Sequence, residues 1–95
     1  MNKSELINSL SEETTFSKKD VARVLESFTR IIERTLKSGG KVAITGFGSF
    51  TISRRPARMG INPATKERIQ LDEICVPRFK AGKNLREKVK LVKIA

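Results

Sequence analysis

The sequence predicts an α+β fold in which two helices come first, strands follow, and a short helix comes last. Apolar residues recur at helical spacing as far as about residue 38, alternate from Lys41 onward, and are separated by glycine and proline. A chain of 95 residues is expected to form one domain. A lone core of this size would be marginal, so association with a second copy would relieve the shortage.

The first helix is predicted over residues 3–13. Asn2 followed by Glu5 is a plausible capping pair, in which a side chain binds a free backbone N–H at the start of the helix. The apolar positions that follow share one stripe, namely Leu6, Ile7 and Leu10.

A longer helix is predicted over residues 18–38. Ser17 and Asp20 open it in the manner of a capping box, with Asp in place of Glu. The apolar stripe contains Val21, Leu25, Phe28, Ile32 and Leu36, and is widened by Ala22, Val24 and Ile31. A face this wide needs cover on more than one side. The pair Gly39-Gly40 supplies the left-handed geometry that ends the helix.

Two strands are predicted next, around Val42 and Ile44 and around Phe50 and Ile52, because these residues alternate with polar ones. Between them, residues 46–48 (Gly-Phe-Gly) are expected to form a tight turn. Phosphate binding is the alternative for such a motif. Neither a further glycine nor a P-loop Lys-Ser/Thr follows at the right place, and the next segment is a strand, so the structural turn is favoured. Phe47 and Phe50 are expected to be core aromatics.

Residues 54–74 are predicted to form an extended two-stranded ribbon that turns near residues 62–65. The segment is too polar to bury itself, so it is expected to project into solvent. Basic residues are closely spaced in this segment, namely Arg54, Arg55, Arg58, Lys66 and Arg68. A strand with Ile74, Val76 and Phe79 follows, in which Cys75 is expected to be a small apolar filler.

The last helix is predicted from Lys83 to about Lys90, with fraying beyond it. The single domain, residues 1–95, is therefore expected to consist of a helical part over residues 1–40, a sheet with its arm over residues 41–81, and a C-terminal helical part over residues 82–95.

Net charge is the clearest guide to function. Residues 1–40 hold seven basic and six acidic side chains, net +1, whereas residues 41–95 hold thirteen and four, net +9. This excess indicates a polyanionic partner. A basic surface that is merely solvated is the alternative. The single cysteine fits a reducing compartment. The sequence has no long apolar run, so neither a membrane span nor a secretory segment is expected.

An enzyme is not expected. The chain has no histidine, and its one cysteine cannot form a metal cluster. The carboxylates Glu67, Asp72 and Glu73 lie in or beside the basic ribbon, where structural pairing is the simpler explanation. No cofactor and no metal are predicted.

Duplex DNA fits the basic ribbon better. Guanidinium groups on a thin ribbon can enter a groove and neutralise phosphates. Pro63, at the expected tip, could wedge between base pairs and kink the duplex. Ordinary turn chemistry after Asn62 is the alternative for Pro63, and the spacing alone favours it.

The sequence resembles the HU/IHF family of bacterial histone-like proteins over nearly its whole length. The matching segments are residues 1–6 (MNKSEL), 46–50 (GFGSF), 55–63 (RPARMGINP) and 76–83 (VPRFKAGK). The resemblance implies two helices beneath a three-stranded antiparallel sheet, an intertwined homodimer or a heterodimer with a paralogue, and two arms that reach around DNA. Minor-groove insertion by an apolar wedge is a property of this family.

Carried over by position, the resemblance implies DNA contacts from the arm and from the body. Those from the arm are Arg54, Arg55, Arg58, Ile61, Asn62, Pro63, Lys66 and Arg68, with Pro63 as the wedge. Those from the body, to phosphates, are Lys3, Lys80, Lys83 and Arg86.

This chain departs from the family pattern at two arm positions. Where the family usually has Arg before the Asn-Pro pair, this chain has Ile61, which removes an expected minor-groove contact but could extend the wedge. Where the family often has Gly in the turn, this chain has Lys66. Both departures bear on bending more than on binding.

The predicted function is therefore that of a dimeric architectural protein of the cytoplasmic nucleoid, which binds, bends and condenses double-stranded DNA with little sequence specificity. A site-specific bender like IHF is the nearest variant. An RNA-binding or ribosome-associated basic protein is the rival from another class. Binding to an anionic membrane is disfavoured, because most of the basic excess lies outside any long amphipathic helix.

Overall fold

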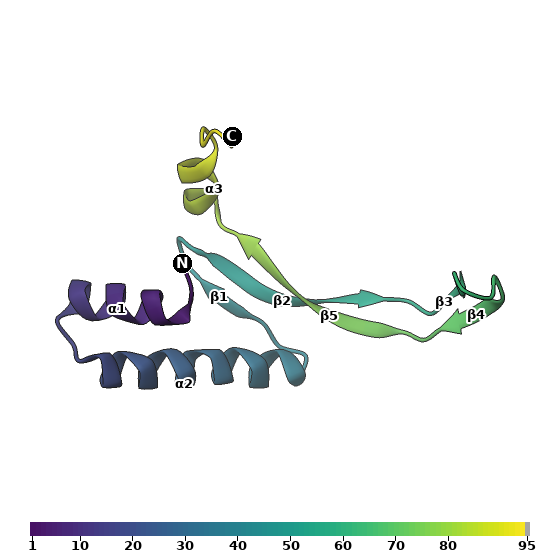
Figure 1. The fold of residues 1–95 in the computed structure, drawn as a ribbon, viewed down its shortest axis with the longest axis horizontal. Helices are drawn as coiled ribbons and strands as arrows, with labels where there is room; N and C mark the ends of the chain where they lie inside the picture. Colours follow the sequence, from purple (N-terminus) through teal and green to yellow (C-terminus); the bar gives the residue numbers. More distant parts are fainter. Residues whose placement is uncertain (95) are drawn as a thin grey trace. The chain divides into compact units, whose positions relative to one another are not determined.

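The computed structural model describes residues 1–94 and confirms the α+β fold. The chain divides into two compact units, Met1–Arg34 and Thr35–Ala95, which are described separately. The helices and strands, labelled in Figure 1, are α1 (Lys3–Thr14), α2 (Lys18–Lys37), β1 (Val42–Ile44), β2 (Gly48–Arg55), β3 (Arg58–Ile61), β4 (Arg68–Leu71), β5 (Ile74–Ala81) and α3 (Lys83–Val89). None of the helices in residues 1–94 is long and apolar enough to cross a membrane.

Helix α1 begins where the capping pair predicts. The side chain of Asn2 accepts a hydrogen bond from the backbone N–H of Glu5 at 2.9 Å. The helix ends at Thr14, and Thr15 adopts a left-handed conformation with φ of 64°. The Ser11 hydroxyl then donates to the carbonyl of Phe16 at 2.6 Å, which holds the connection to the next helix. Side-chain hydrogen bonds thus define both ends of α1.

Helix α2 also begins and ends by local chemistry. The Ser17 hydroxyl oxygen accepts from the backbone N–H of Asp20 at 3.1 Å, which confirms the Ser17 half of the predicted capping box. At the other end, Gly39 N–H donates to Leu36 O at 3.0 Å and Gly40 N–H donates to Thr35 O at 2.9 Å. Gly39 has φ of +86°, so this pair of bonds is the Schellman arrangement that glycine favours.

The first unit has very little interior. Val21 is the only hydrophobic residue described as buried, at 6% exposure, in residues 1–94. Val24 remains 67% exposed and Ile31 45% exposed on the widened apolar face of α2. A helix of this length cannot bury such a face against α1 alone.

The predicted three-stranded antiparallel sheet is confirmed, with strand order β1-β2-β5. Phe50 faces Phe79 across β2 and β5, and their ring centroids are 4.9 Å apart. Phe47, in the turn before β2, lies 5.3 Å from the same Phe79 ring. The three rings form a cluster, but the prediction that Phe47 is a core aromatic is wrong for the single chain, in which Phe47 and Phe79 each remain 43% exposed.

The Gly-Phe-Gly turn is structural, as predicted. Gly46 has φ of +85°, a conformation that other residues rarely adopt. At Gly48 a Cβ atom would lie 2.5 Å from the Phe79 ring and 2.6 Å from Lys80 O, so only glycine fits. The N–H of Phe47 donates to Ile44 O at 3.0 Å, which leaves it engaged in the turn rather than turned toward a phosphate.

Two expectations need correction. The C-terminal helical part, given as residues 82–95, is helical only over α3, whose bounds confirm the helix predicted from Lys83 to about Lys90; Ala95 lies outside the described residues. Beyond Val89 the N–H of Val92 makes only a short-range bond to Val89 O, and β-branched residues disfavour further helix. Cys75 is not a buried filler either, since it is exposed on β5 opposite Arg54.

Candidate nucleic-acid interface

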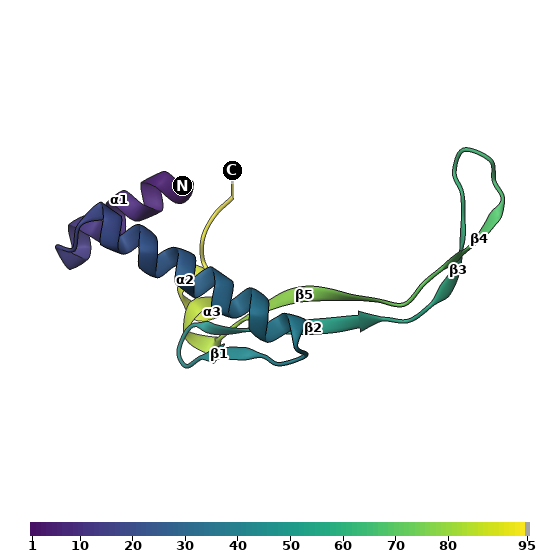
Figure 2. The same ribbon diagram turned by 90° about the horizontal axis from the view of Figure 1, so that it is seen from below.

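The arm, defined here as residues 54–75, is one hairpin with one interruption. Pairing of β2 with β5 ends at Arg55↔Ile74, and pairing of β3 with β4 resumes at Arg58↔Leu71. Two residues on each strand are unpaired between these points, and because the number is equal on both strands the register is unchanged. Pro56 lies in the gap and has no N–H to donate, which explains why the ladder stops there. Figure 2 shows the outer part of the arm turning away from the line of β2 and β5 at this place.

The tip of the arm is a closed, hydrogen-bonded turn. The Asn62 side-chain oxygen accepts from Ala64 N–H at 2.9 Å, and Asn62 N–H donates to Glu67 O at 2.8 Å. Pro63 is exposed directly after Asn62. The turn chemistry expected for an Asn-Pro pair is therefore present, and it presents the proline ring to solvent. The two interpretations of Pro63 are compatible.

Lys66 completes the turn in a conformation that costs energy. Its φ is +60°, and its N–H donates to Asn62 O at 2.6 Å. A residue with a Cβ is disfavoured there by about 1–2 kcal/mol relative to glycine. This explains why glycine suits the position, and it shows that lysine at residue 66 leaves the turn closed.

The cations of the arm lie on both of its faces. Successive residues of a strand point to opposite sides, so Arg54 and Arg55 do not share a face. Arg58 pairs with Leu71 while Arg68 pairs with Ile61, and these two pairs also alternate. All four of these arginines are exposed. A ribbon inside a groove is flanked by phosphates on two sides, and cations on both faces suit that setting.

Arg54 is the one arm cation for which the described residues show an ion pair. Its guanidinium donates to the Glu73 carboxylate at 2.7 Å, and the two side chains are 70% and 46% exposed. Such an exposed pair contributes little to stability. A phosphate could replace the carboxylate at small cost.

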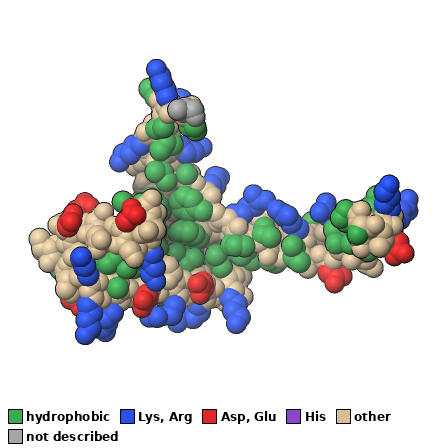
Figure 3. Space-filling view, in the orientation of Figure 1, with side chains coloured by type: hydrophobic (Ala, Val, Ile, Leu, Met, Phe, Trp, Pro, Cys, Tyr) green, Lys and Arg blue, Asp and Glu red, His purple; other side chains and the backbone are tan. Residues whose placement is uncertain are grey.

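The two faces of the sheet differ in chemistry. Phe50, Ile52 and Phe79 lie on one face, which is mainly aromatic and apolar and also carries Arg54 at its outer end. The other face carries most of the hydroxyls and cations, namely Ser49, Thr51, Ser53, Arg55, Arg78 and Lys80, together with Val76 and Ile74. Lys and Arg side chains also line the arm in the space-filling view (Figure 3). Arg78 was not among the predicted contacts, although its spacing of two residues from Lys80 in a strand could have revealed it.

Lys80 and Arg86 come together although one lies on β5 and the other on α3. Both line a shallow hollow of about 340 Å³ beside the Gly-Phe-Gly turn. Ser49 lines it as well. Lys83, by contrast, is exposed at the first position of α3 and is not among the lining residues. Lys3 belongs to the helical unit, where its Nζ lies 3.9 Å from a Glu26 carboxylate oxygen.

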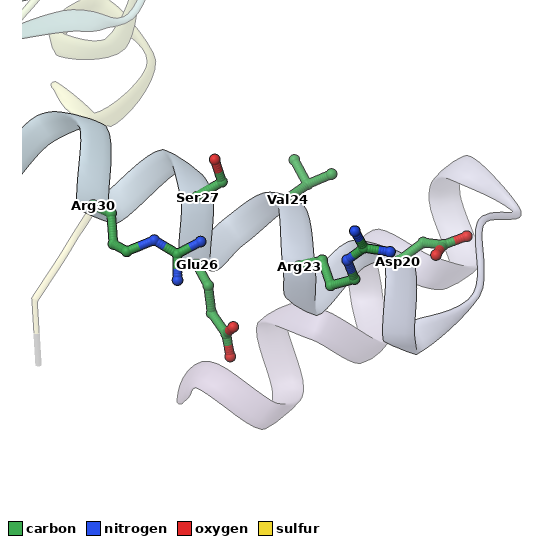
Figure 4. A pocket seen from close by; sticks show the side chains of 6 residues that line it. All are labelled: Asp20, Arg23, Val24, Glu26, Ser27 and Arg30. Carbon is green, nitrogen blue, oxygen red and sulfur yellow. The ribbon is translucent and has the colours of Figure 1, made fainter.

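The largest hollow described has no comparable chemistry. It has a volume of about 560 Å³ and lies on α2 alone, lined by Asp20, Arg23, Val24, Glu26, Ser27 and Arg30 (Figure 4). Acidic and basic residues alternate there at spacings of three or four, as on any solvated helix surface. Val24 and Ser27 point to one side of the helix and Glu26 to the other. In residues 1–94 no group of three or more possible metal ligands occurs.

Comparison with known proteins gives a consistent result. Residues 1–90 match the family described as bacterial DNA-binding protein. DNA-binding protein HU-1 of Halalkalibacterium halodurans is 44% identical over 89 residues, which cover 94% of this chain and 99% of that protein. Integration host factor subunit beta of Mannheimia succiniciproducens is 46% identical over 90 residues, covering 94% and 96%. A solved Anabaena HU–DNA cocrystal structure is 41% identical with a TM-score of 0.90, covering 97% of this chain and 100% of that one.

Proposed function

This chain belongs to the HU/IHF family of bacterial DNA-binding proteins, and we propose that it is an architectural nucleoid protein that binds and bends duplex DNA with little sequence specificity. The observation that carries the proposal is the arm: a thin ribbon with arginines on both faces and an exposed proline at a closed tip. Phosphate contacts on such a ribbon supply affinity without sequence information.

The proposed interface has two parts. In the arm, Arg54, Arg55, Arg58, Lys66 and Arg68 neutralise phosphates on either side of the minor groove, and Pro63 inserts between base pairs. The body supplies further phosphate contacts from Lys80, Lys83 and Arg86, to which the structure leads us to add Arg78. Lys3 stays a proposed contact, which would have to exchange Glu26 for a phosphate.

We also propose that a second copy of the chain completes the fold. On α2, Val24 remains 67% exposed and Ile31 45% exposed. A largely apolar hollow of about 240 Å³ lies open in the helical unit, lined by Leu10, Thr14, Phe16, Val21, Val24, Leu25 and Phe28. A related subunit could serve in place of an identical copy, since one relative is described as the beta subunit of a host factor.

Two further parts of the proposal follow from the family. The protein acts by shaping DNA in the cytoplasmic nucleoid and catalyses no reaction. Site-specific bending remains the nearest variant, because relatives described as HU and as integration host factor are almost equally identical, at 44% and 46%.

The test is energy transfer between dyes on the two ends of a short duplex, titrated with protein at several salt concentrations. We expect transfer to rise on binding, because the ends approach as the duplex bends, and the affinity to fall steeply with salt. Salt-sensitive binding without a change in transfer would remove bending from the proposal. Tighter binding to structured RNA than to the duplex would overturn it in favour of an RNA-binding protein.

A further inference from the structure

The outer part of the arm carries large apolar side chains whose exposure turn chemistry does not explain. Met59 is 63% exposed and Ile61 is 66% exposed, both on β3. They lie two residues apart and therefore point to the same side of the ribbon. Their cross-strand neighbours on that side are Gln70 and Arg68, which are polar. We call this pair of side chains the apolar strip.

The opposite side of the same ribbon is built differently. Gly60 pairs with Ile69, and a Cβ at Gly60 would lie 3.0 Å from the Leu71 side chain and 3.8 Å from that of Ile69. Because Gly60 has no side chain, the Leu71 side chain can pack against the backbone of β3 at this position. Ile69 is accordingly only 39% exposed, and Leu71 is partly buried. The arm therefore covers part of the apolar surface on this side and leaves Met59 and Ile61 more exposed.

The surroundings of the apolar strip indicate what covers it. On the side of the strip, Arg68 pairs with Ile61 and is exposed, and Lys66 is exposed in the adjoining turn, whereas Arg58 lies on the opposite side with Leu71. Figure 3 shows hydrophobic side chains beside Lys and Arg, and some acidic groups, at the outer end of the arm. A protein or lipid partner would have to neutralise these cations as well as cover the strip. The minor groove of DNA does both, since phosphates flank it while sugars and unstacked bases accept apolar side chains.

We propose that Met59 and Ile61 determine DNA preference, by contacting an opened minor groove through apolar surface next to Pro63. This inference rests on the proposed function and specifies how the arm tip selects its site. Arginine is drawn to the narrow minor groove of A-tracts, whereas apolar insertion is easiest at flexible pyrimidine–purine steps. With isoleucine at residue 61, the tip favours duplexes that contain such steps over A-tract duplexes.

The variants that test this are Ile61→Ala and Ile61→Arg, with Ile69→Ala as the matched control on the covered side of the same ribbon. Each is measured on two duplexes of equal length, one with central TG/CA steps and one with a central A-tract. Ile61→Ala should bind the first duplex about tenfold more weakly at every salt concentration, because the lost contact is apolar. Its salt dependence should equal that of the parent.

Ile61→Arg should shift the preference toward the A-tract and steepen the salt dependence by about one counterion for each arm. Ile69→Ala should change neither preference nor slope. Ile61→Ala binding that equals that of the parent on both duplexes would overturn the inference and leave DNA binding intact. A parent that binds neither duplex would instead overturn the proposed function. Thermal unfolding of each variant verifies that the body of the protein is unchanged.

Discussion

The helical unit and the arm both expose apolar side chains, but in opposite electrostatic settings. On α2, Val24 and Ile31 lie among acidic and basic residues in near balance, and residues 1–40 have a net charge of +1. On the arm, Met59 and Ile61 lie among cations, in a part of the chain (residues 41–95) whose net charge is +9. Apolar exposure alone would not distinguish the two regions.

The charge around each apolar surface indicates the kind of partner that would cover it. A neutral rim around a wide apolar face suits a second copy of the chain, because burial then costs little in desolvated charge. A cationic rim around a narrow apolar strip suits a polyanion with an apolar interior, which is a DNA groove.

The two regions also differ in the interactions that stabilise their local structure. Side-chain caps and a glycine motif define the helices, whereas cross-strand pairing and one closed turn hold the arm.

The largest expected effect comes from placing a charge in the helical unit. Leu25→Asp puts a carboxylate into the apolar hollow of about 240 Å³ in the helical unit, and we expect it to destabilise the protein by at least about 3 kcal/mol. Size-exclusion chromatography with light scattering should show the dimer dissociating, and DNA binding should be lost with it. A variant that remains dimeric would show that this face is not the contact between subunits.

Next in size is the loss of bending in Pro63→Ala. The closed turn around Asn62 does not need the proline ring, so the arm should stay formed and affinity should fall only a few-fold. The bend should lessen by roughly tens of degrees, because wedges of this kind kink duplexes by about 20–90°. End-to-end energy transfer measures the change, and equal bend angles for variant and parent would contradict the wedge.

A smaller effect separates the charges of the two regions. Arg68→Ala should weaken binding several-fold and reduce the salt dependence by about one counterion for each arm. Arg23→Ala, its counterpart in the helical unit, lies on the α2 surface between Asp20 and Glu26 and should leave the salt dependence unchanged. Equal effects of the two substitutions would mean that both regions contact phosphate.

The smallest effect concerns the turn at the arm tip. Lys66→Gly relieves the left-handed strain at φ of +60° and should stabilise the turn by about 1 kcal/mol. Hydrogen exchange of the Asn62 N–H, which donates to Glu67 O, should slow about fivefold while the melting temperature barely moves. Lys66→Ala removes the same charge but keeps the Cβ, so faster or equal exchange is expected there.

Much of the local structure could be predicted from the residues themselves. The caps at Asn2 and Ser17 and the glycine end of α2 depend on contacts within a few residues, and each is present as expected. The same holds for the turn at Gly46. Prediction was weaker where the outcome depended on partners far along the chain. Cys75, for example, was expected to be an apolar filler, but the pairing of β5 with β2 leaves it exposed opposite Arg54.

The order of helices and strands, the helix ends, the position of the arm tip and the placement of charge all follow from the residues alone, because periodicity, capping and composition act locally. Three features needed the folded chain: which arm residues share a face, why Leu71 covers Gly60 while Met59 and Ile61 stay exposed, and where the ladder breaks at Pro56. These features follow from the register between strands, where a slip of one residue would exchange the two faces of the arm.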